Sequence, residues 1–231
     1  MKSNILSSLI DLLFPRTCFS CNDRIQNDII CESCLNSLEF LTEVCPVCGA
    51  YDQGKTCLIC QGNEFQFDKA RSVFQFNKMI LNLIHDLKYD EMRKVAILFG
   101  KLTEDYLREF NPFQSVDIIA PVPLHKVKKR SRGFNQSQLL TAEISRRMNW
   151  PHEPNLIQRR RFTETQTKLG RKDRKKNVQD AFSLKAKLNI NNKNILIVDD
   201  VFTTGATVNS ISSVLRQNGA AKVFVLTIAR A

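Results

Sequence analysis

Apolar and polar positions along residues 65–231 follow the two periods that distinguish strands from helices. Compact apolar runs bounded by polar residues predict strands, and apolar residues that recur every three or four positions predict amphipathic helices. The predicted strands are 70–76, 116–122, 195–198 and 223–228, and the predicted helices are 79–87, 95–106, 136–148 and 208–215. Because strands and helices alternate, we expect an α/β fold with a mostly parallel sheet flanked by helices.

Residues 1–64 show little regular periodicity, and they contain short turns and all eight cysteines of the chain. We therefore divide the chain into a small Cys-rich module, 1–64, and an α/β domain, 65–231. Helical spacing over 5–13 predicts a short amphipathic helix. Asp11 and the serines interrupt this stretch and no small-residue cleavage site follows, so we expect no signal peptide. No apolar run approaches the roughly 18 residues of a membrane helix. We expect a cytoplasmic protein without a membrane span.

The cysteines form four CxxC pairs, separated by nine, ten and eight residues. They are Cys18, Cys21, Cys31, Cys34, Cys45, Cys48, Cys57 and Cys60. A CxxC turn directs two thiolates at one point, and two such turns complete a tetrahedral zinc site. Eight cysteines therefore predict about two structural zinc ions. Sequential pairing is the simplest arrangement, and interleaved pairing fits the same spacing.

Disulfides are the main alternative for these cysteines, and the cytosolic character of the sequence argues against them. A redox CxxC is normally single and lies within a βαβ unit, whereas iron–sulfur ligation usually brings cysteines closer together. Zinc bound by thiolates alone leaves no open coordination position. We expect it to stabilise a module whose apolar core is too small to fold alone.

Positive charge is concentrated in one part of the chain. The formal net charge is +11, and residues 121–180, with 16 Lys and Arg against 5 Asp and Glu, account for all of it. Such a block favours a polyanionic partner, either a nucleic acid or a phosphorylated small molecule, although a solvated basic loop is the simpler alternative. Residues 158–180 lack periodicity and predict a long mobile loop, a kind of segment that is usually functional or disordered.

The string ILIVDDVFTTGAT at 195–207 carries the clearest chemistry. An apolar strand delivers Asp199 and Asp200 to its carboxyl end, where open α/β sheets bind ligands. Small and hydroxyl-bearing residues then lead into a helix, namely Thr203, Thr204, Gly205, Ala206 and Thr207. Their backbone N–H groups and the helix N-terminus favour a phosphate. Carboxylates would repel a phosphate, so we expect them to bind ribose hydroxyls and Mg²⁺ on a diphosphate.

This string resembles the signature of type I phosphoribosyltransferases, which binds phosphoribosyl diphosphate (PRPP) with two acidic residues and a Thr/Gly loop. Over nearly its whole length, the chain also resembles the ComF family of ComFC- and GntX-like proteins. The resemblance rests on the cysteine module, the PRPP motif, LIHDLKYDEM at 83–92, PVPLHKVKKRSRGFNQSQLL at 121–140 and RRRFTETQTKLGRKDRKKNVQDAF at 159–182. It implies a phosphoribosyltransferase-like α/β domain that follows a double zinc ribbon.

The resemblance also implies roles for particular residues. Asp199 and Asp200 would hold the ribose, and the Thr/Gly loop would hold the 5-phosphate. Cations that would contact a diphosphate or a DNA strand are Lys88, Arg130, Arg132, Arg171 and Arg174.

Two classes of function fit these features. The ComF resemblance implies natural transformation, in which the protein would handle incoming single-stranded DNA beside other competence proteins such as a ComFA-like helicase. The alternative is a metabolic phosphoribosyltransferase that transfers ribose 5-phosphate from PRPP to an amine or base. The sequence identifies no catalytic residue and no acceptor. Aromatic residues are sparse in 121–180, where only Phe134, Trp150 and Phe162 occur, so base stacking would be limited.

Overall fold

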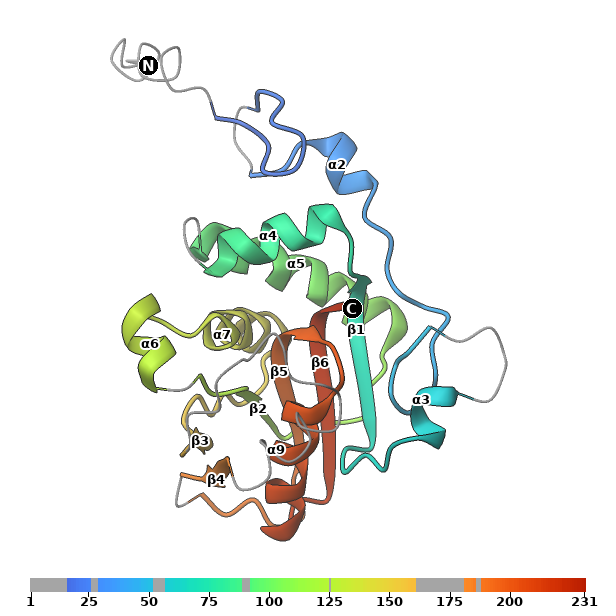
Figure 1. The fold of residues 1–231 in the computed structure, drawn as a ribbon, viewed down its shortest axis with the longest axis vertical. Coiled ribbons are helices and arrows are strands. Elements are labelled where there is room, and N and C mark those ends of the chain that lie inside the picture. Colours follow the sequence, from blue (N-terminus) through green and yellow to red (C-terminus); the bar gives the residue numbers. More distant parts are fainter. Residues whose placement is uncertain are drawn as a thin grey trace.

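A four-stranded sheet forms the centre of the protein (Figure 1). The computed structural model describes residues 16–25, 29–51, 57–88, 92–124, 126–160, 181–185 and 188–231. The strands are β1 (Lys69–Gln75), β2 (Ile118–Pro121), β5 (Asn194–Phe202) and β6 (Lys222–Arg230), in the order β1-β6-β5-β2. All three pairings are parallel, so the predicted α/β fold is confirmed.

Helices cover both faces of this sheet. They are α4 (Lys78–Lys88), α5 (Met92–Phe110), α7 (Gln136–Met148) and α9 (Ala206–Gln217). Alternate strand residues point to opposite faces, and this alternation divides the core into two parts. Leu196 and Val198 pack with α4, α5 and α7, whereas Ile195 and Ile197 pack with α9. The near-continuous apolar sequence of β5 follows from this double burial.

Three details differ from the sequence-based expectation. Strand β5 continues to Phe202, beyond the predicted end at Val198. A short helix, α6 (Lys126–Arg132), was not predicted, because its polar sequence carries no apolar period. Strands β3 (Ile157–Arg159) and β4 (Phe182–Leu184) pair antiparallel, so the predicted loop begins later than 158. Residues 161–180 of that loop lie outside the described residues.

The Cys-rich part contains two short helices, α2 (Glu32–Asn36) and α3 (Leu58–Gln61). Cys18 and Ile30 belong to the same buried apolar cluster as the residues of α4 and α5, and Leu41 N donates a hydrogen bond to Val73 O of β1 at 2.9 Å. The Cys-rich part therefore packs directly on the sheet and its helices, and the module boundary near residue 64 stays a prediction.

The described helices include none that is long and apolar enough to cross a membrane. The amphipathic helix predicted over 5–13 lies outside the described residues.

Candidate ligand site and metal centres

The eight cysteines come together as two groups of four in sequence order. Within each group, all four sulfur atoms lie within 4.8 Å of one another. The first group is Cys18, Cys21, Cys31 and Cys34, and the second is Cys45, Cys48, Cys57 and Cys60. All eight are free of disulfides. The structure thus supports sequential pairing over the interleaved alternative.

The sulfur geometry fits tetrahedral zinc in both groups. Sulfur–sulfur distances are 3.6 Å for Cys21–Cys31, 3.7 Å for Cys45–Cys60 and 3.6 Å for Cys48–Cys57. Four thiolates that each lie about 2.3 Å from one zinc ion are separated by roughly 3.8 Å. Backbone N–H groups also point at the sulfurs, as in the 3.3 Å contact from Cys31 N to Cys18 Sγ. Both groups therefore have the geometry of structural zinc ribbons.

Asp199 and Asp200 lie in the carboxyl-terminal part of β5 and are held by two different helices. Ser137, in the first turn of α7, donates its hydroxyl hydrogen to Asp199 Oδ1 at 2.8 Å. Lys88, the last residue of α4, places Nζ 2.5 Å from Asp200 Oδ2. Figure 1 shows how α4 reaches this position, because the helix lies above the carboxyl ends of the strands. The fold therefore collects both carboxylates at the edge where parallel sheets bind ligands.

Asp200 Oδ2 is buried and forms an ion pair with the Lys88 ammonium. An acceptor of this kind, beside a second carboxylate, supplies the oxygen ligands that Mg²⁺ prefers. The carboxylate oxygens of Asp199 and Asp200 thus fit a divalent cation at this edge of the sheet.

Desolvation raises the pKa of Asp199 to about 8, and the negative charge of Asp200 adds to the rise. The hydrogen bond from Ser137 acts in the opposite direction. The site thus disfavours the ionised form of Asp199, because this carboxyl group is desolvated and lies beside a second carboxylate. A bound cation would favour the ionised form of Asp199 and lower its pKa.

The loop after β5 turns at Gly205, directly before α9. Gly205 has φ of 73°, and a Cβ at this position would come within 2.6 Å of Phe202 Cζ, so the loop requires glycine. Helix α9 begins at the next residue, and its first N–H groups have no partner within the helix. The other residues predicted for the loop, all of them exposed or half-buried, are Thr203, Thr204, Ala206 and Thr207. The arrangement can bind a phosphate at the N-terminus of α9.

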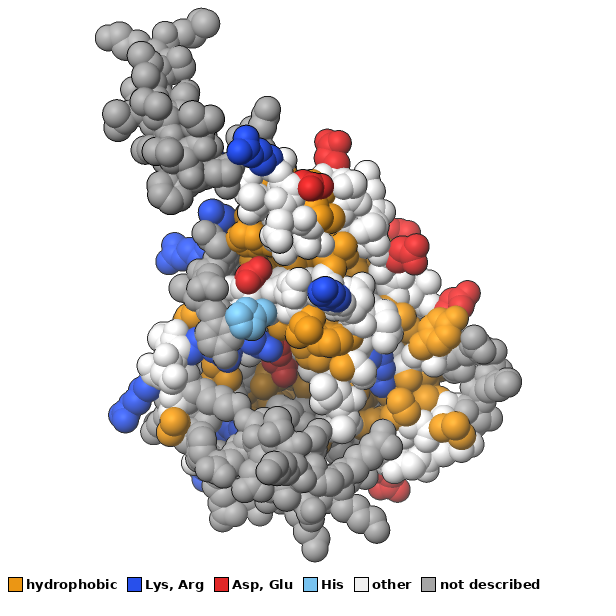
Figure 2. Space-filling model, turned by 45° about the horizontal axis from the view of Figure 1, so that its top comes forward, with side chains coloured by type: hydrophobic (Ala, Val, Ile, Leu, Met, Phe, Trp, Pro, Cys, Tyr) orange, Lys and Arg blue, Asp and Glu red, His pale blue; other side chains and the backbone are white. Residues whose placement is uncertain are grey.

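The predicted cations fall into three groups. Lys88 lies at the site but contacts Asp200, where a phosphate contact had been predicted. Arg130 is exposed, and Arg132 donates from Nη1 to Gln136 Oε1 at 2.7 Å beside the first turn of α7. Arg171 and Arg174 lie outside the described residues. On the face in Figure 2, Lys and Arg side chains gather toward the side of α6, whereas most carboxylates lie toward the opposite side.

Sequence reasoning missed Ser137 as a residue of the site. It occurs in the string RGFNQS, and Asn135 before it accepts a hydrogen bond from Ser137 N at 3.2 Å as the N-cap of α7. The predicted helix over 136–148 already placed Ser137 in a first turn, and the Asn135 cap agrees with that helix start. Nothing in the sequence pairs this turn with Asp199, because that contact depends on packing.

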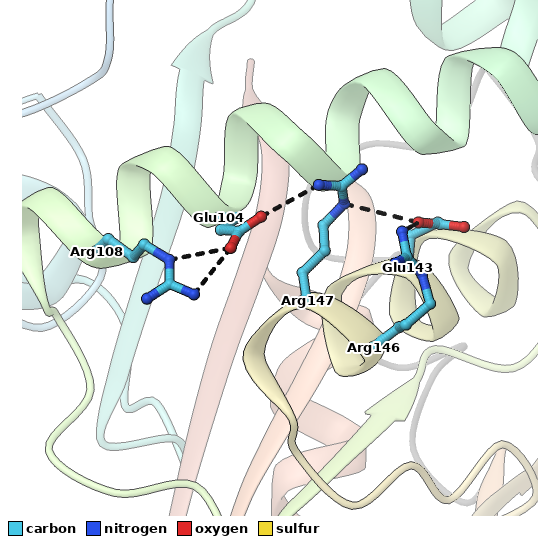
Figure 3. Close-up of polar contacts among 5 residues, drawn as sticks. All are labelled: Glu104, Arg108, Glu143, Arg146 and Arg147. Carbon is cyan, nitrogen blue, oxygen red and sulfur yellow. Dashed lines mark hydrogen bonds and ion pairs between the residues drawn. The ribbon is translucent and has the colours of Figure 1, made fainter.

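Ion pairs between α5 and α7 support the helix that carries Ser137 (Figure 3). Arg147 Nη1 lies 3.1 Å from Glu104 Oε2 of α5, and its Nε lies 3.7 Å from Glu143 Oε2 of its own helix. The helices approach closely at Gly100, where a Cβ would come within 2.9 Å of Glu143 Cβ. These contacts fix α7 against α5 and thereby fix the first turn of α7 beside β5.

This combination defines an α/β protein with a parallel sheet that carries a double zinc ribbon. Residues 9–61 match the family model of the double zinc ribbon domain. Among solved structures, the purine phosphoribosyltransferase from Pyrococcus horikoshii Ot3 is similar, with 14% identity, a TM-score of 0.37, and coverage of 59% of this chain and 81% of that chain.

Two curated relatives match most of the sequence. Competence protein F of Haemophilus influenzae is 31% identical over 227 residues, which cover 94% of this chain and 98% of the relative. DNA utilization protein YhgH of Escherichia coli is 32% identical over 206 residues, which cover 87% of this chain and 90% of the relative. The chain belongs to the ComF family, in which competence protein F is found.

Proposed function

We propose that this protein binds PRPP or a related phosphoribosyl ligand together with Mg²⁺, and acts in DNA uptake during natural transformation by handling single-stranded DNA. One observation carries the proposal. The relatives named for competence and DNA utilization are similar over 94% and 87% of this chain, so the similarity extends over both the Cys-rich part and the α/β domain. A role that uses both parts explains this similarity better than a role of the sheet alone.

The ligand is inferred from the order of groups along β5 and α9. Two carboxylates precede the loop, and the loop precedes a helix N-terminus. A ligand with vicinal hydroxyls at one end and a phosphate at the other satisfies both parts without placing phosphate against Asp199 or Asp200. Mg²⁺ would neutralise the diphosphate and supply the positive charge that the carboxylate pair lacks.

Single-stranded DNA is inferred from charge. Residues 121–180 carry the whole net positive charge of the chain, and most of the cations visible in Figure 2 lie toward the side of α6. Arg130 and Arg132 of α6, with Arg171 and Arg174, would follow the phosphates of the strand. Other competence proteins, such as a ComFA-like helicase, would deliver or receive that strand.

A metabolic phosphoribosyltransferase is the second candidate, and the same carboxylate pair and loop favour it. In that case the cations would bind only the diphosphate, and ribose 5-phosphate would pass from PRPP to an amine or base. The two candidates differ in one measurable property, which is affinity for DNA.

The test measures both ligands on one preparation of the full chain. Calorimetric titration with PRPP and Mg²⁺ measures the phosphoribosyl site, and fluorescence anisotropy of a labelled single strand across a salt series measures DNA binding. Six phosphate contacts on a single strand would give a slope of about −4 in log K against log salt. Absence of DNA binding at low salt would overturn the competence role and favour the transferase.

Charge-reversal variants identify the residues that bind single-stranded DNA. Arg171→Glu, Arg174→Glu and Lys175→Glu together should abolish DNA binding, because they remove cations and add repulsion. The control reverses three exposed cations of α4 and α5 in the same way, with Lys78→Glu, Arg93→Glu and Lys101→Glu. Equal loss of DNA binding in both variants would show that net charge alone drives binding.

A further inference from the structure

The last strand ends between the second four-cysteine group and the ligand loop. Arg230, only 5% exposed, donates a hydrogen bond from Nη1 to Cys48 O at 2.7 Å. Its guanidinium carbon lies 4.4 Å from the centroid of the Phe202 ring, at the start of the ligand loop. One buried side chain thus contacts a zinc-ligand turn on one side and the ligand loop on the other.

A buried guanidinium is costly unless negative charge compensates it. Arg230 is buried against the second group, because its guanidinium donates to the backbone oxygen of Cys48. Four thiolates around one zinc ion carry a formal charge of about −2. The loaded centre therefore supplies the negative charge that a buried Arg230 needs.

A second arginine completes this charge balance. Arg71 of β1 is half-buried and donates from Nη1 to Cys45 O at 3.3 Å and to Ala70 O at 2.7 Å. Two guanidinium groups next to a centre of about −2 leave a nearly neutral cluster. Arg71 holds this centre to the edge of β1, and Arg230 extends it toward the ligand loop.

The CxxC turn that contains Val47 and Gly49 packs directly against β1 at the edge of the sheet. Ala70 N donates to Val47 O at 2.7 Å. Gly49 has φ of 69°, and a Cβ there would come within 2.5 Å of Ala70 O, so the turn approaches the strand as closely as a glycine allows. The first group is placed differently, because Cys18 packs in the apolar cluster of α4 and α5. The two centres therefore have different neighbours.

Contacts continue from Arg230 to the residue that caps α9. Phe202 is 2% exposed and supports the loop at Gly205, whose Cβ position lies 2.6 Å from Phe202 Cζ and 3.3 Å from Phe65 Cε1. A parallel route runs through Asn209 in α9, whose Oδ1 accepts a hydrogen bond from Gln66 N at 2.5 Å. Phe65 and Gln66 lie a few residues after Cys60, the last cysteine of the second group. Both routes end at the N-terminus of α9, where the phosphate is proposed to bind.

We propose that Arg230 is a positioning residue that couples zinc in the second group to the shape of the ligand loop. Zinc holds Arg230 over Phe202, and Phe202 holds the Gly205 turn in the form that accepts a phosphate. The first group has no such role. The part of this inference that concerns ligand binding rests on the proposed function, whereas the coupling between zinc and the loop does not.

The first test needs no ligand. Full-length protein loaded with zinc is partly stripped by a chelator, and alkylation of the freed cysteines shows which group has lost its metal. Amide hydrogen exchange of residues 201–209 should rise when the second group loses zinc and stay unchanged when only the first group does. Unchanged exchange after loss of the second zinc would overturn the coupling.

The second test uses Arg230→Met, which keeps an unbranched apolar stem and removes the charge. Release of zinc from the second group should become about tenfold faster, as expected for loss of a hydrogen bond to a charged group, while the first group is unaffected. The matched control is Arg108→Met on α5, whose side chain is 63% exposed and pairs with Glu104. Equal release rates in both variants and the parent would refute the proposed role. If Arg230→Met fails to fold, hydrogen exchange of the parent protein after partial zinc removal still tests whether zinc in the second group is coupled to the ligand loop.

The third test uses PRPP with Mg²⁺ as the probe. Coupling between two binding sites is reciprocal in affinity, so bound PRPP should raise the affinity of the second group for zinc, measured in competition with a chelator, and leave that of the first unchanged. PRPP that binds without this effect would contradict the coupling. PRPP that does not bind at all would refute the proposed function, and the two ligand-free tests would still decide the role of Arg230.

Discussion

Lys88 Nζ lies 2.5 Å from Asp200 Oδ2, so the last residue of α4 neutralises a carboxylate in β5. The side chains are 26% and 10% exposed, which limits screening of the pair by water. A cation bound at Asp200 must share this carboxylate with Lys88 or displace it. The pair therefore links the position of α4 to occupation of the site.

We expect Lys88→Met to lower the free energy of unfolding by about 1–3 kcal/mol, because it leaves a buried carboxylate without its cation. Lys101→Met, at an exposed position of α5, is the control and should change little. Urea unfolding of both variants gives the comparison.

A double-mutant cycle tests whether the stability effect comes from this pair. Asp200→Asn should weaken the binding of PRPP with Mg²⁺ in a protein that remains folded. Combined with Lys88→Met, it should cost less stability than the sum of the single changes. Additive costs would show that the two side chains do not interact.

Stability should depend on pH through Asp199. Its pKa is raised to about 8 in the folded protein from 3.8, so between these values the folded state holds more protons than the unfolded state. The free energy of unfolding contributed by this group is therefore fully present below about pH 4 and is lost as pH rises toward 8. Asp199→Asn should flatten this decline. Urea unfolding at pH 6 and pH 8.5 measures it, with Asp105→Asn on the exposed side of α5 as control.

Gly205→Ala should weaken PRPP binding and cost about 1–3 kcal/mol of stability, because alanine at positive φ is strained and its Cβ would meet Phe202. The control is Gly62→Ala, where φ is −94° and the nearest atom to the new Cβ is Leu58 O at 3.8 Å. Calorimetric titration measures the PRPP affinity of both variants, and thermal unfolding measures their stability. A Gly205→Ala protein with parental affinity would show that PRPP binding does not require glycine in this loop.

The α5–α7 contact should depend on Arg147 and not on Arg146. Arg147 is 17% exposed and joins Glu104 to Glu143, whereas Arg146 is 64% exposed and contacts only Glu143 among the carboxylates of the described residues (Figure 3). Arg147→Met should shift the urea midpoint downward, and Arg146→Met should leave it nearly unchanged. Equal shifts would mean that Arg147 contributes no more than a surface ion pair.

Metal content should follow the two groups of four. Elemental analysis of the parent protein should find two zinc ions per chain, one for each group. Cys18→Ser should remove one zinc and Cys48→Ser the other, because each group needs all four thiolates. Iron in place of zinc would contradict the assignment, and so would loss of both ions in either variant.

Much of the architecture follows from local sequence. Helix α7 begins and ends at the predicted residues 136 and 148. Both signals for this helix are local in the sequence, because the apolar residues repeat every three or four positions and Asn135 caps the first turn. The four CxxC pairs follow from the spacing, since two cysteines three positions apart can share a turn, whereas the sequential grouping of these pairs is decided by the structure. In contrast, α6 could not be predicted from periodicity, because a helix made of basic and polar residues has no apolar face.

The contacts within the site depend on tertiary structure. Asp199 and Asp200 are recognisable in sequence because a buried strand and a glycine loop flank them directly. Their partners Lys88 and Ser137 come from α4 and α7, which meet β5 only after the sheet and helices pack. Arg230 is an ordinary arginine near the end of the chain until the parallel order β1-β6-β5 places it between Cys48 and Phe202. Sequence determines which groups are available and how each segment folds locally. Packing decides which charges meet, because those distances depend on every element between them.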